Sequence, residues 1–140
     1  MVDPQSGAVA TLPDSQGLRT ARTSPNGAYL AALEPYRHEL RVYDFQVGTW
    51  KTLASNFTGD NLSWSHDSQF IFFDKAWGVD PAIIRVRLKD GQQAIAVHMN
   101  KLPASTGWYV RWFGLDPEDA PIIATAANYY EIYRVDWRWR

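Results

Sequence analysis

The sequence has no cysteine, no long hydrophobic run and almost no net charge. The lack of cysteine excludes disulfides, thiol catalysis and thiolate metal sites. No stretch approaches the ~20 apolar residues of a membrane-spanning helix. A net charge of −1 gives no overall attraction to nucleic acid or anionic membranes, so neither is an expected partner. The chain begins Met-Val-Asp-Pro, which is not a signal-peptide pattern, and the cellular location stays undetermined.

Helical periodicity is also nearly absent, while aromatic residues are abundant. The chain of 140 residues has seven Trp, seven Tyr and six Phe, and 46% of its residues are hydrophobic. Its short apolar or alternating runs are separated by clusters of turn residues. That pattern predicts an all-β fold of many short antiparallel strands.

A polar turn followed by an apolar strand recurs three times. The copies are SPNGAYLAAL from Ser24, SHDSQFIFFD from Ser65 and DPEDAPIIAT from Asp116. A second alternating strand follows each copy, as LRVYDF, IIRVRL and IYRVDW. After the first two of these comes a glycine turn, at Gly48 and Gly91, and then one more strand. Each unit therefore contains up to four strands.

Four-stranded units of roughly 40–50 residues are typical of β-propeller blades. A solenoid would use shorter units or helices, and an immunoglobulin-like sandwich would not repeat internally. The predicted strands lie near residues 19–23, 28–33, 39–45, 49–54, 61–64, 69–73, 82–88, 93–98, 108–113, 121–125 and 130–137. We expect one domain over residues 1–140, with a closing strand and linker at 1–17 and blades at 18–58, 59–103 and 104–140. The third blade lacks a fourth strand of its own.

The stretches TSPNGAYLAAL…LRVYDFQVGTWKTLA and LSWSHDSQFIFFD…AIIRVRLKDGQQ resemble the TolB-like propeller repeat. WFGLDPEDAPIIA…EIYRVDW resembles the closing blade of bacterial regulators, many of them acidobacterial, that join a winged-helix domain to a TolB-like propeller. The resemblance implies a six-bladed ring that senses or binds something. The winged helix makes the DNA contacts in those regulators, and this sequence does not contain it. The repeat is altered at four positions: Thr23, Asn26, Ser68 and Asp119.

No motif in the chain indicates catalysis or a cofactor. There is no G-x-S-x-G nucleophile elbow. His38, His66 and His98 lie in different units without metal-ligand spacing. The acidic turn at residues 116–119 lacks the alternating ligands of a calcium loop. We therefore expect a non-enzymatic protein with no metal site and no cofactor. The enzyme alternative would require ionisable groups that converge in the central channel or on one face.

Aromatic and basic residues recur in the connections between the second and third strands of the units. In propellers these connections share one rim, so they are candidates for binding a peptide or protein. The candidate rim residues are Tyr36, Arg37, Lys75, Trp77, Tyr129 and Tyr130. The alternative is that these rings pack locally over their own loops. Trp64, Trp112 and Phe113 are expected to pack between blades, and so are Phe45 and Trp137, which share a repeat position.

The N-terminal VDPQSGAVATL matches YDFQVGTWKTL, the end of the first unit. We therefore expect residues 8–12 to form a fourth strand that belongs to no blade in their own chain. A homodimer would use it: the strand of each subunit would pair with residues 131–137 of the other, giving a six-bladed ring with twofold symmetry. The expected closure residues are Ala8, Val9, Ala10, Thr11, Leu12, Ile132, Tyr133 and Val135. The alternative is that a different polypeptide completes the propeller.

Overall fold

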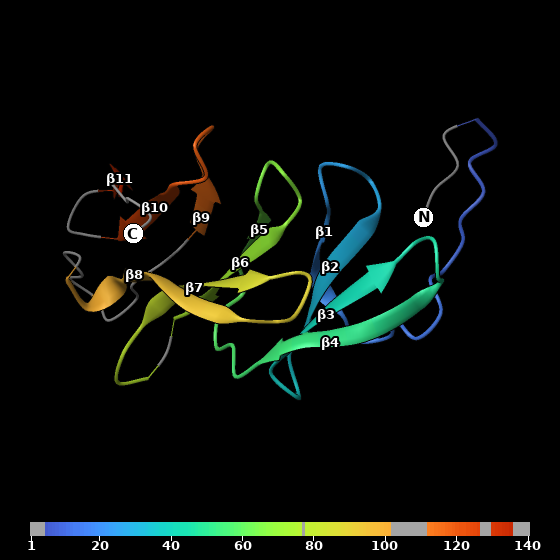
Figure 1. Cartoon of the computed structure of the whole chain (residues 1–140), viewed down its shortest axis with the longest axis horizontal. Coiled ribbons are helices and arrows are strands. Elements are labelled where there is room, and N and C mark those ends of the chain that lie inside the picture. Colours follow the sequence, from blue (N-terminus) through green and yellow to red (C-terminus); the bar gives the residue numbers. More distant parts are fainter. Residues whose placement is uncertain (1–4, 77, 102–111, 127–129, 136–140) are drawn as a thin grey trace.

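The computed structural model describes residues 5–76, 78–101, 112–126 and 130–135, and this part of the chain is all-β (Figure 1). A short 3-10 helix, η1 (Met99–Lys101), is its one helical element in the described residues. The first sheet contains β1 (Arg19–Thr23), β2 (Tyr29–Glu34), β3 (Glu39–Asp44) and β4 (Thr49–Ser55). The second contains β5 (Leu62–Trp64), β6 (Phe70–Lys75), β7 (Ala82–Arg87) and β8 (Gln93–His98). The third contains β9 (Trp112–Leu115), β10 (Pro121–Ala126) and β11 (Tyr130–Arg134).

Each sheet is an antiparallel meander in chain order, as the sequence predicts. The strand β1 contacts β5, and β5 contacts β9, so the first strands of the three sheets lie next to one another. The strands β4 and β8 form the far edges of the first and second sheets, away from β1 and β5. The sheets are thus stacked face to face around a common side formed by their first strands (Figure 1).

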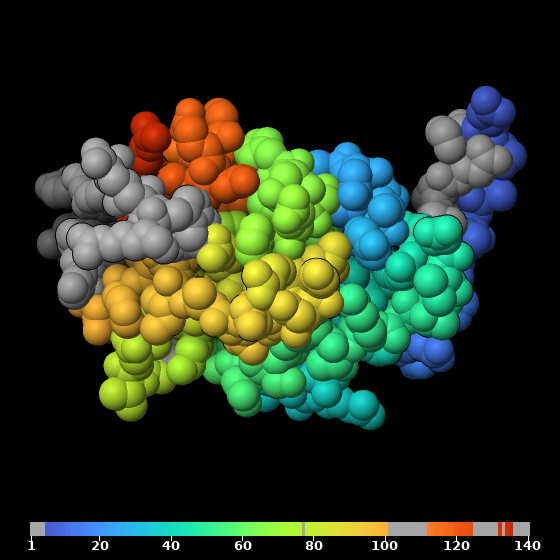
Figure 2. Space-filling model, viewed as in Figure 1, coloured from blue at the N-terminus to red at the C-terminus, as the bar shows by residue number. Residues whose placement is uncertain are grey.

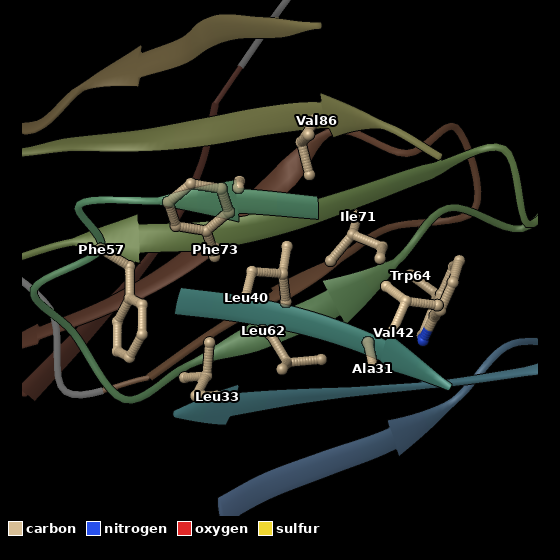
Figure 3. Packing of buried hydrophobic residues seen from close by; sticks show 11 residues of the cluster. Ala31, Leu33, Leu40, Val42, Phe57, Leu62, Trp64, Ile71, Phe73 and Val86 are labelled. Atoms are coloured by element: carbon tan, nitrogen blue, oxygen red, sulfur yellow. The ribbon is translucent and has the colours of Figure 1, made fainter. Parts of the chain in front are cut away.

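The main core lies between the first and second sheets (Figure 3). Alternation along each strand directs Leu33, Leu40 and Val42 of the first sheet against Ile71 and Phe73 of the second. All five side chains are essentially inaccessible to solvent.

Trp64 joins this core at the end of β5. Its indole is 7% exposed, and Nε1 donates a hydrogen bond of 2.8 Å to the carbonyl oxygen of Arg22 in β1. The bond satisfies the one polar atom of the ring. The expected packing of Trp64 between two sheets is confirmed.

A second core joins the second and third sheets, and Phe113, Ile123 and Met99 are buried in it. Phe45 and Trp112 are 37% and 50% exposed, so neither is packed between two sheets of one chain. Phe45 follows the end of β3 and packs its edge against Tyr43, at 5.4 Å between ring centroids. Residues two apart on an extended strand lie on the same face, so Phe45 shares a face with Tyr43. That face is opposite the one on which Val42 packs into the main core. Trp137 lies outside the described residues.

The first two repeat turns share one hydrogen-bonding pattern. Ser24 Oγ accepts from the amide of Tyr29 at 3.0 Å, and Ser65 Oγ accepts from the amide of Phe70 at 2.9 Å. In the third copy the equivalent position is Pro121, which has no N–H, and Asp116 Oδ1 accepts instead from the amide of Ala120 at 2.9 Å. The third turn is therefore held by a different hydrogen bond.

Two positions where glycine is usual carry side chains that link neighbouring sheets. Ser68 and Asp119 both have a φ of 61°. Ser68 Oγ accepts from the amide of Asn26 in the first sheet's turn at 3.1 Å, and Asp119 Oδ1 accepts from the amide of His66 at 3.0 Å. The strained conformation is therefore offset by an inter-sheet hydrogen bond.

Replacing Ser68 separates these two effects. Ser68→Ala keeps the strain and loses the bond, so the free energy of unfolding should fall by about 1 kcal/mol. Ser68→Gly loses the bond and relieves about 1 kcal/mol of strain, so it should be close to neutral. Urea unfolding of both variants measures the difference. A glycine variant less stable than the alanine variant would contradict this explanation.

Candidate functional site

Tyr36 and Arg37, two of the expected rim residues, lie on the tight turn between β2 and β3. The carboxylate of Glu34 accepts their main-chain amides at 3.2 and 2.7 Å, which fixes the turn. Tyr36 is 88% exposed. Lys75 is the last residue of β6 and is half-buried. Trp77, Tyr129 and the side chain of Tyr130 lie outside the described residues, so the rim is seen only in part.

Beside this turn lies a hollow of about 340 Å³. It opens between the β2–β3 turn and the connection that leads from β4 to β5. Its lining residues are Arg19, Pro35, His38, Phe57, Thr58, Gly59 and Asp60. Of these, only His38 was considered in the sequence, and there as an isolated histidine.

An ion pair crosses the wall of the hollow. Arg19 Nη2 and Asp60 Oδ1 are 2.6 Å apart, and both side chains are more than half exposed. Phe57 is 2% exposed, and the ring of His38 meets it edge-on at 5.9 Å. The repeat does contain a signal for the pair, because Arg19 precedes Ser24 by the same interval by which Asp60 precedes Ser65.

Beneath the hollow lies a buried carboxylate, Asp74 of β6, with 1% exposure. Its two oxygens accept hydrogen bonds from the main-chain amide and side-chain amide of Asn61, at 2.9 and 2.8 Å. Burial raises the pKa of Asp74 above its usual 3.8, although the bonds from Asn61 act in the opposite direction. A side chain at Gly59 would collide with the Asp74 carboxylate. The connection before β5 is therefore held by one buried acid.

Asp74 should make stability depend on pH with a definite sign. A raised folded-state pKa means that the folded chain takes up a proton more readily than the unfolded chain. The free energy of unfolding of the wild type should therefore improve relative to Asp74→Asn as the pH falls from about 7 to about 4.

Urea unfolding across this pH range measures the difference. The control is Asp90→Asn, because the hydrogen bond from Arg87 lowers the pKa of Asp90. Stability from Asp90 should be lost as the pH falls below its ordinary pKa of 3.8, which is the opposite sign, so the profiles are continued to about pH 2. Parallel pH profiles for the wild type and Asp74→Asn would contradict the assignment.

The remaining ionisable groups of interest are paired. Asp116 has its pKa lowered, first by the hydrogen bond from the Ala120 amide. Its Oδ2 lies 2.9 Å from Arg134 Nε but accepts no hydrogen bond. His66 Nδ1 lies 2.7 Å from Asp119, and His98 Nδ1 lies 3.3 Å from Asp80. Within the described residues, no three His, Asp or Glu side chains gather closely enough to hold a metal ion.

The two ends of the stack of sheets differ in what they present. At one end, the segment before β1 lies across the first sheet, on the face opposite the main core (Figure 2). Trp50 Nε1 donates to the carbonyl of Pro13 at 2.8 Å, and Leu12 lies near Leu30 around a cavity of about 350 Å³. Residues 8–12 form no continuous strand within the chain, and Val9 alone makes an isolated β-bridge.

At the other end of the stack, β11 is the edge strand of the third sheet. In the pairing register, Ile132 lies opposite Ala124, which lies opposite Trp112. Ile132 is 76% exposed and Trp112 is 50% exposed. This end therefore combines an apolar face with an edge strand that has no neighbour in the described part of the chain.

Solved structures with the same arrangement of sheets are numerous. TolB from Acinetobacter baumannii superposes with a TM-score of 0.66 at 21% identity, covering 86% of this chain and 30% of that one. A chain of the nidogen/laminin complex superposes with a TM-score of 0.69 at 8% identity, covering 89% and 47%. The tricorn protease gives 0.66 at 16% identity, covering 86% and 12%. The fold is that of a β-propeller, similar to the propeller of TolB.

These similarities establish the fold alone. No protein-family model and no curated protein sequence matches the chain. The chain spans less than half the length of the propeller structures it matches. Similar structures also include an oligogalacturonate lyase, so the propeller fold is compatible with enzymes as well as with binding proteins. No helix in the described residues has the length and hydrophobicity of a membrane span.

Proposed function

We propose that the chain is a non-catalytic binding and scaffolding segment, half of a six-bladed propeller that a second copy closes into a ring. The observation that carries the proposal is the position of the N-terminal segment. In the first sheet, β4 contacts the β7–β8 turn of the second: Lys51 Nζ donates to the carbonyl of Leu88 at 3.3 Å, and the carbonyl of Leu53 lies against Gly91. Residues 12 and 13 contact the first sheet in a comparable way, through Trp50.

This contact supports the proposal that the N-terminal segment takes, beside the first sheet, the place of the outer strand of a preceding blade. The edge strand β11 lies at the opposite end of the stack (Figure 1). One chain's segment is therefore far from its own β11, whereas two chains related by a twofold axis would each supply the strand that the other needs. Exposed Trp112 and Ile132 would be buried by the same association.

A different polypeptide could complete the ring instead. This alternative draws its support from the length comparison, since the chain spans 30% of TolB and 47% of the nidogen complex chain. It uses the same edge and the same face, and differs only in the identity of the partner.

The native mass distinguishes the two. Light scattering after size-exclusion chromatography, at micromolar concentration, should give twice the 16.0 kDa of one chain. A stable monomer would overturn the homodimer and leave completion by another polypeptide. A mass above the dimer would also contradict it, because a twofold ring has no free ends.

The binding part of the proposal is supported by the exposed aromatic ring and the cation on the fixed turn at Tyr36 and Arg37. Exposed aromatic and arginine side chains are enriched where proteins bind one another. The enzymatic alternative is tested by screening hydrolase substrates with and without Ca²⁺. Turnover that survives repurification would overturn the non-catalytic assignment.

A further inference from the structure

The geometry points to the hollow beside the β2–β3 turn as a binding site for the C-terminal end of a peptide, with its carboxylate on Arg19 and an apolar last side chain over Phe57. This inference deepens the rim-binding part of the proposed function. It does not depend on ring closure, because all lining residues come from one chain, between Arg19 and Asp60.

The size and base of the hollow suit a side chain. Its volume of about 340 Å³ lies at the lower end of the range for ligand pockets, roughly 300–1,000 Å³. Phe57 and Pro35 give it an apolar base, and the ring of His38 is held against Phe57. An apolar side chain placed there would be removed from water on several sides.

The charges on the wall suit a chain end. An arginine guanidinium can bind a carboxylate through two parallel hydrogen bonds. Arg19 is paired with Asp60, but both are more than half exposed, and such surface pairs contribute only about 0–1 kcal/mol. A ligand carboxylate could therefore replace Asp60 at small cost. Asp60 would then be available to accept the N–H of a peptide bond.

Three residues around the hollow other than glycine have positive φ: Thr20, His38 and Asn56, at 54°, 56° and 66°. For a β-branched residue such as Thr20 this conformation is a clear outlier. It coincides with an irregularity in the β1–β2 register between Arg19 and Arg22. Bulges of this kind re-aim a neighbouring side chain, and strained residues cluster at ligand sites.

The base of the hollow is also fixed. Gly59 lines it, and the bonds from Asn61 to buried Asp74 lie directly behind Gly59. The connection that forms this side of the hollow is therefore held in place before a ligand arrives, which lowers the entropy cost of binding.

A second hollow on the opposite rim is larger, at about 410 Å³, and also contains cations. There Arg87 is bound by two partners, Asp90 and Gln92, and Lys51 donates to the carbonyl of Leu88. The remaining cation of that hollow, Lys89, lacks the planar group that binds a carboxylate through two hydrogen bonds. Arg19 has that group and only one partner to exchange, Asp60, so we assign the carboxylate to Arg19.

The test uses N-acetylated tripeptides ending in Leu, Val or Phe, each with a free carboxylate or an amide. Their binding to the full chain is followed through the main-chain amide NMR signals of residues 38 and 58. At least one free acid should bind about tenfold more tightly than its amide, a difference of about 1.4 kcal/mol. Equal affinities, or no binding of any peptide at millimolar concentration, would overturn the proposal.

Three variants identify the group responsible. Arg19→Met should abolish the preference for the acid, whereas Arg22→Met, which removes the same charge from the same strand outside the hollow, should keep it. Asp60→Asn should strengthen acid binding, because Arg19 loses its competing partner. If Asp60→Asn weakens acid binding as Arg19→Met does, the pair is only structural and the proposal is wrong. Peptide binding by a chain that light scattering shows to be monomeric would separate this site from ring closure.

Discussion

A chain that lacks residues 1–12 should be monomeric at concentrations where the whole chain is a dimer. In the proposed ring, each subunit's residues 8–12 supply the outer strand of the other's third sheet, so the deletion removes both closing strands at once. It also uncovers Leu30 and Trp50 on the first sheet. We expect the dissociation constant to rise at least about 100-fold, or about 2.7 kcal/mol, in sedimentation equilibrium.

A proline scan keeps the chain intact and tests strand pairing directly. Neighbouring residues of an edge strand point their N–H groups in opposite directions, and only alternate ones bond to the partner strand. Proline has no N–H. Of Ala10→Pro and Thr11→Pro, one should therefore weaken the dimer by at least about tenfold more than the other. Equal and small effects would contradict strand pairing even if the deleted chain aggregates.

The repeat pattern predicted the strands well because strand positions depend on local alternation and on turns that recur. The turns persist at Ser68 and Asp119, where glycine is missing, since each side chain gains a bond to the preceding turn. Comparison with the repeat consensus reveals only that glycine is missing at these positions. The main-chain amide that each side chain bonds lies in another unit, so the local sequence does not predict it.

Whether a residue is buried was less predictable than the strand to which it belongs. Phe45 occupies the same repeat position as Leu88, which packs against the main core. The sequence suggested a buried role for Phe45. The second sheet has the first sheet to cover that position, whereas the equivalent face of the first sheet has the N-terminal segment. The repeat pattern assumes a neighbouring sheet on both sides of each unit. It therefore assigns an apolar residue to the core even at the end of the stack, where one face has no neighbouring sheet.

The hollow could not be predicted from composition or motif. Its polar wall comes from equivalent positions of two units, Arg19 and Asp60, which meet only because the first strands of neighbouring sheets lie together. Aligning the units and then placing them side by side would have suggested this pair. The strained φ of Thr20 has no sequence signal, because threonine favours ordinary strand conformations.

Replacing Trp64 should have the largest effect on stability of any single substitution considered. The indole is almost fully buried between the first two sheets, stacks with Tyr29 at 6.4 Å, and bonds to the carbonyl of Arg22. Trp64→Ala should lower the free energy of unfolding by about 3–5 kcal/mol, which is a large part of the stability of a typical domain. Chemical unfolding followed by circular dichroism measures it.

Two matched variants separate burial from polarity and position. Trp64→Phe keeps most of the apolar volume but leaves the carbonyl of Arg22 without the bond from the indole, so it should cost less, about 1–3 kcal/mol. Trp112→Ala removes an indole that is half exposed at the outer face of the third sheet. It should change the stability of the monomer by less than about 1 kcal/mol and weaken the dimer instead, because this face meets the second copy in the proposed ring. A loss below 1 kcal/mol for Trp64→Ala would mean that the first two sheets do not depend on the contact through which the strand β5 packs against β1.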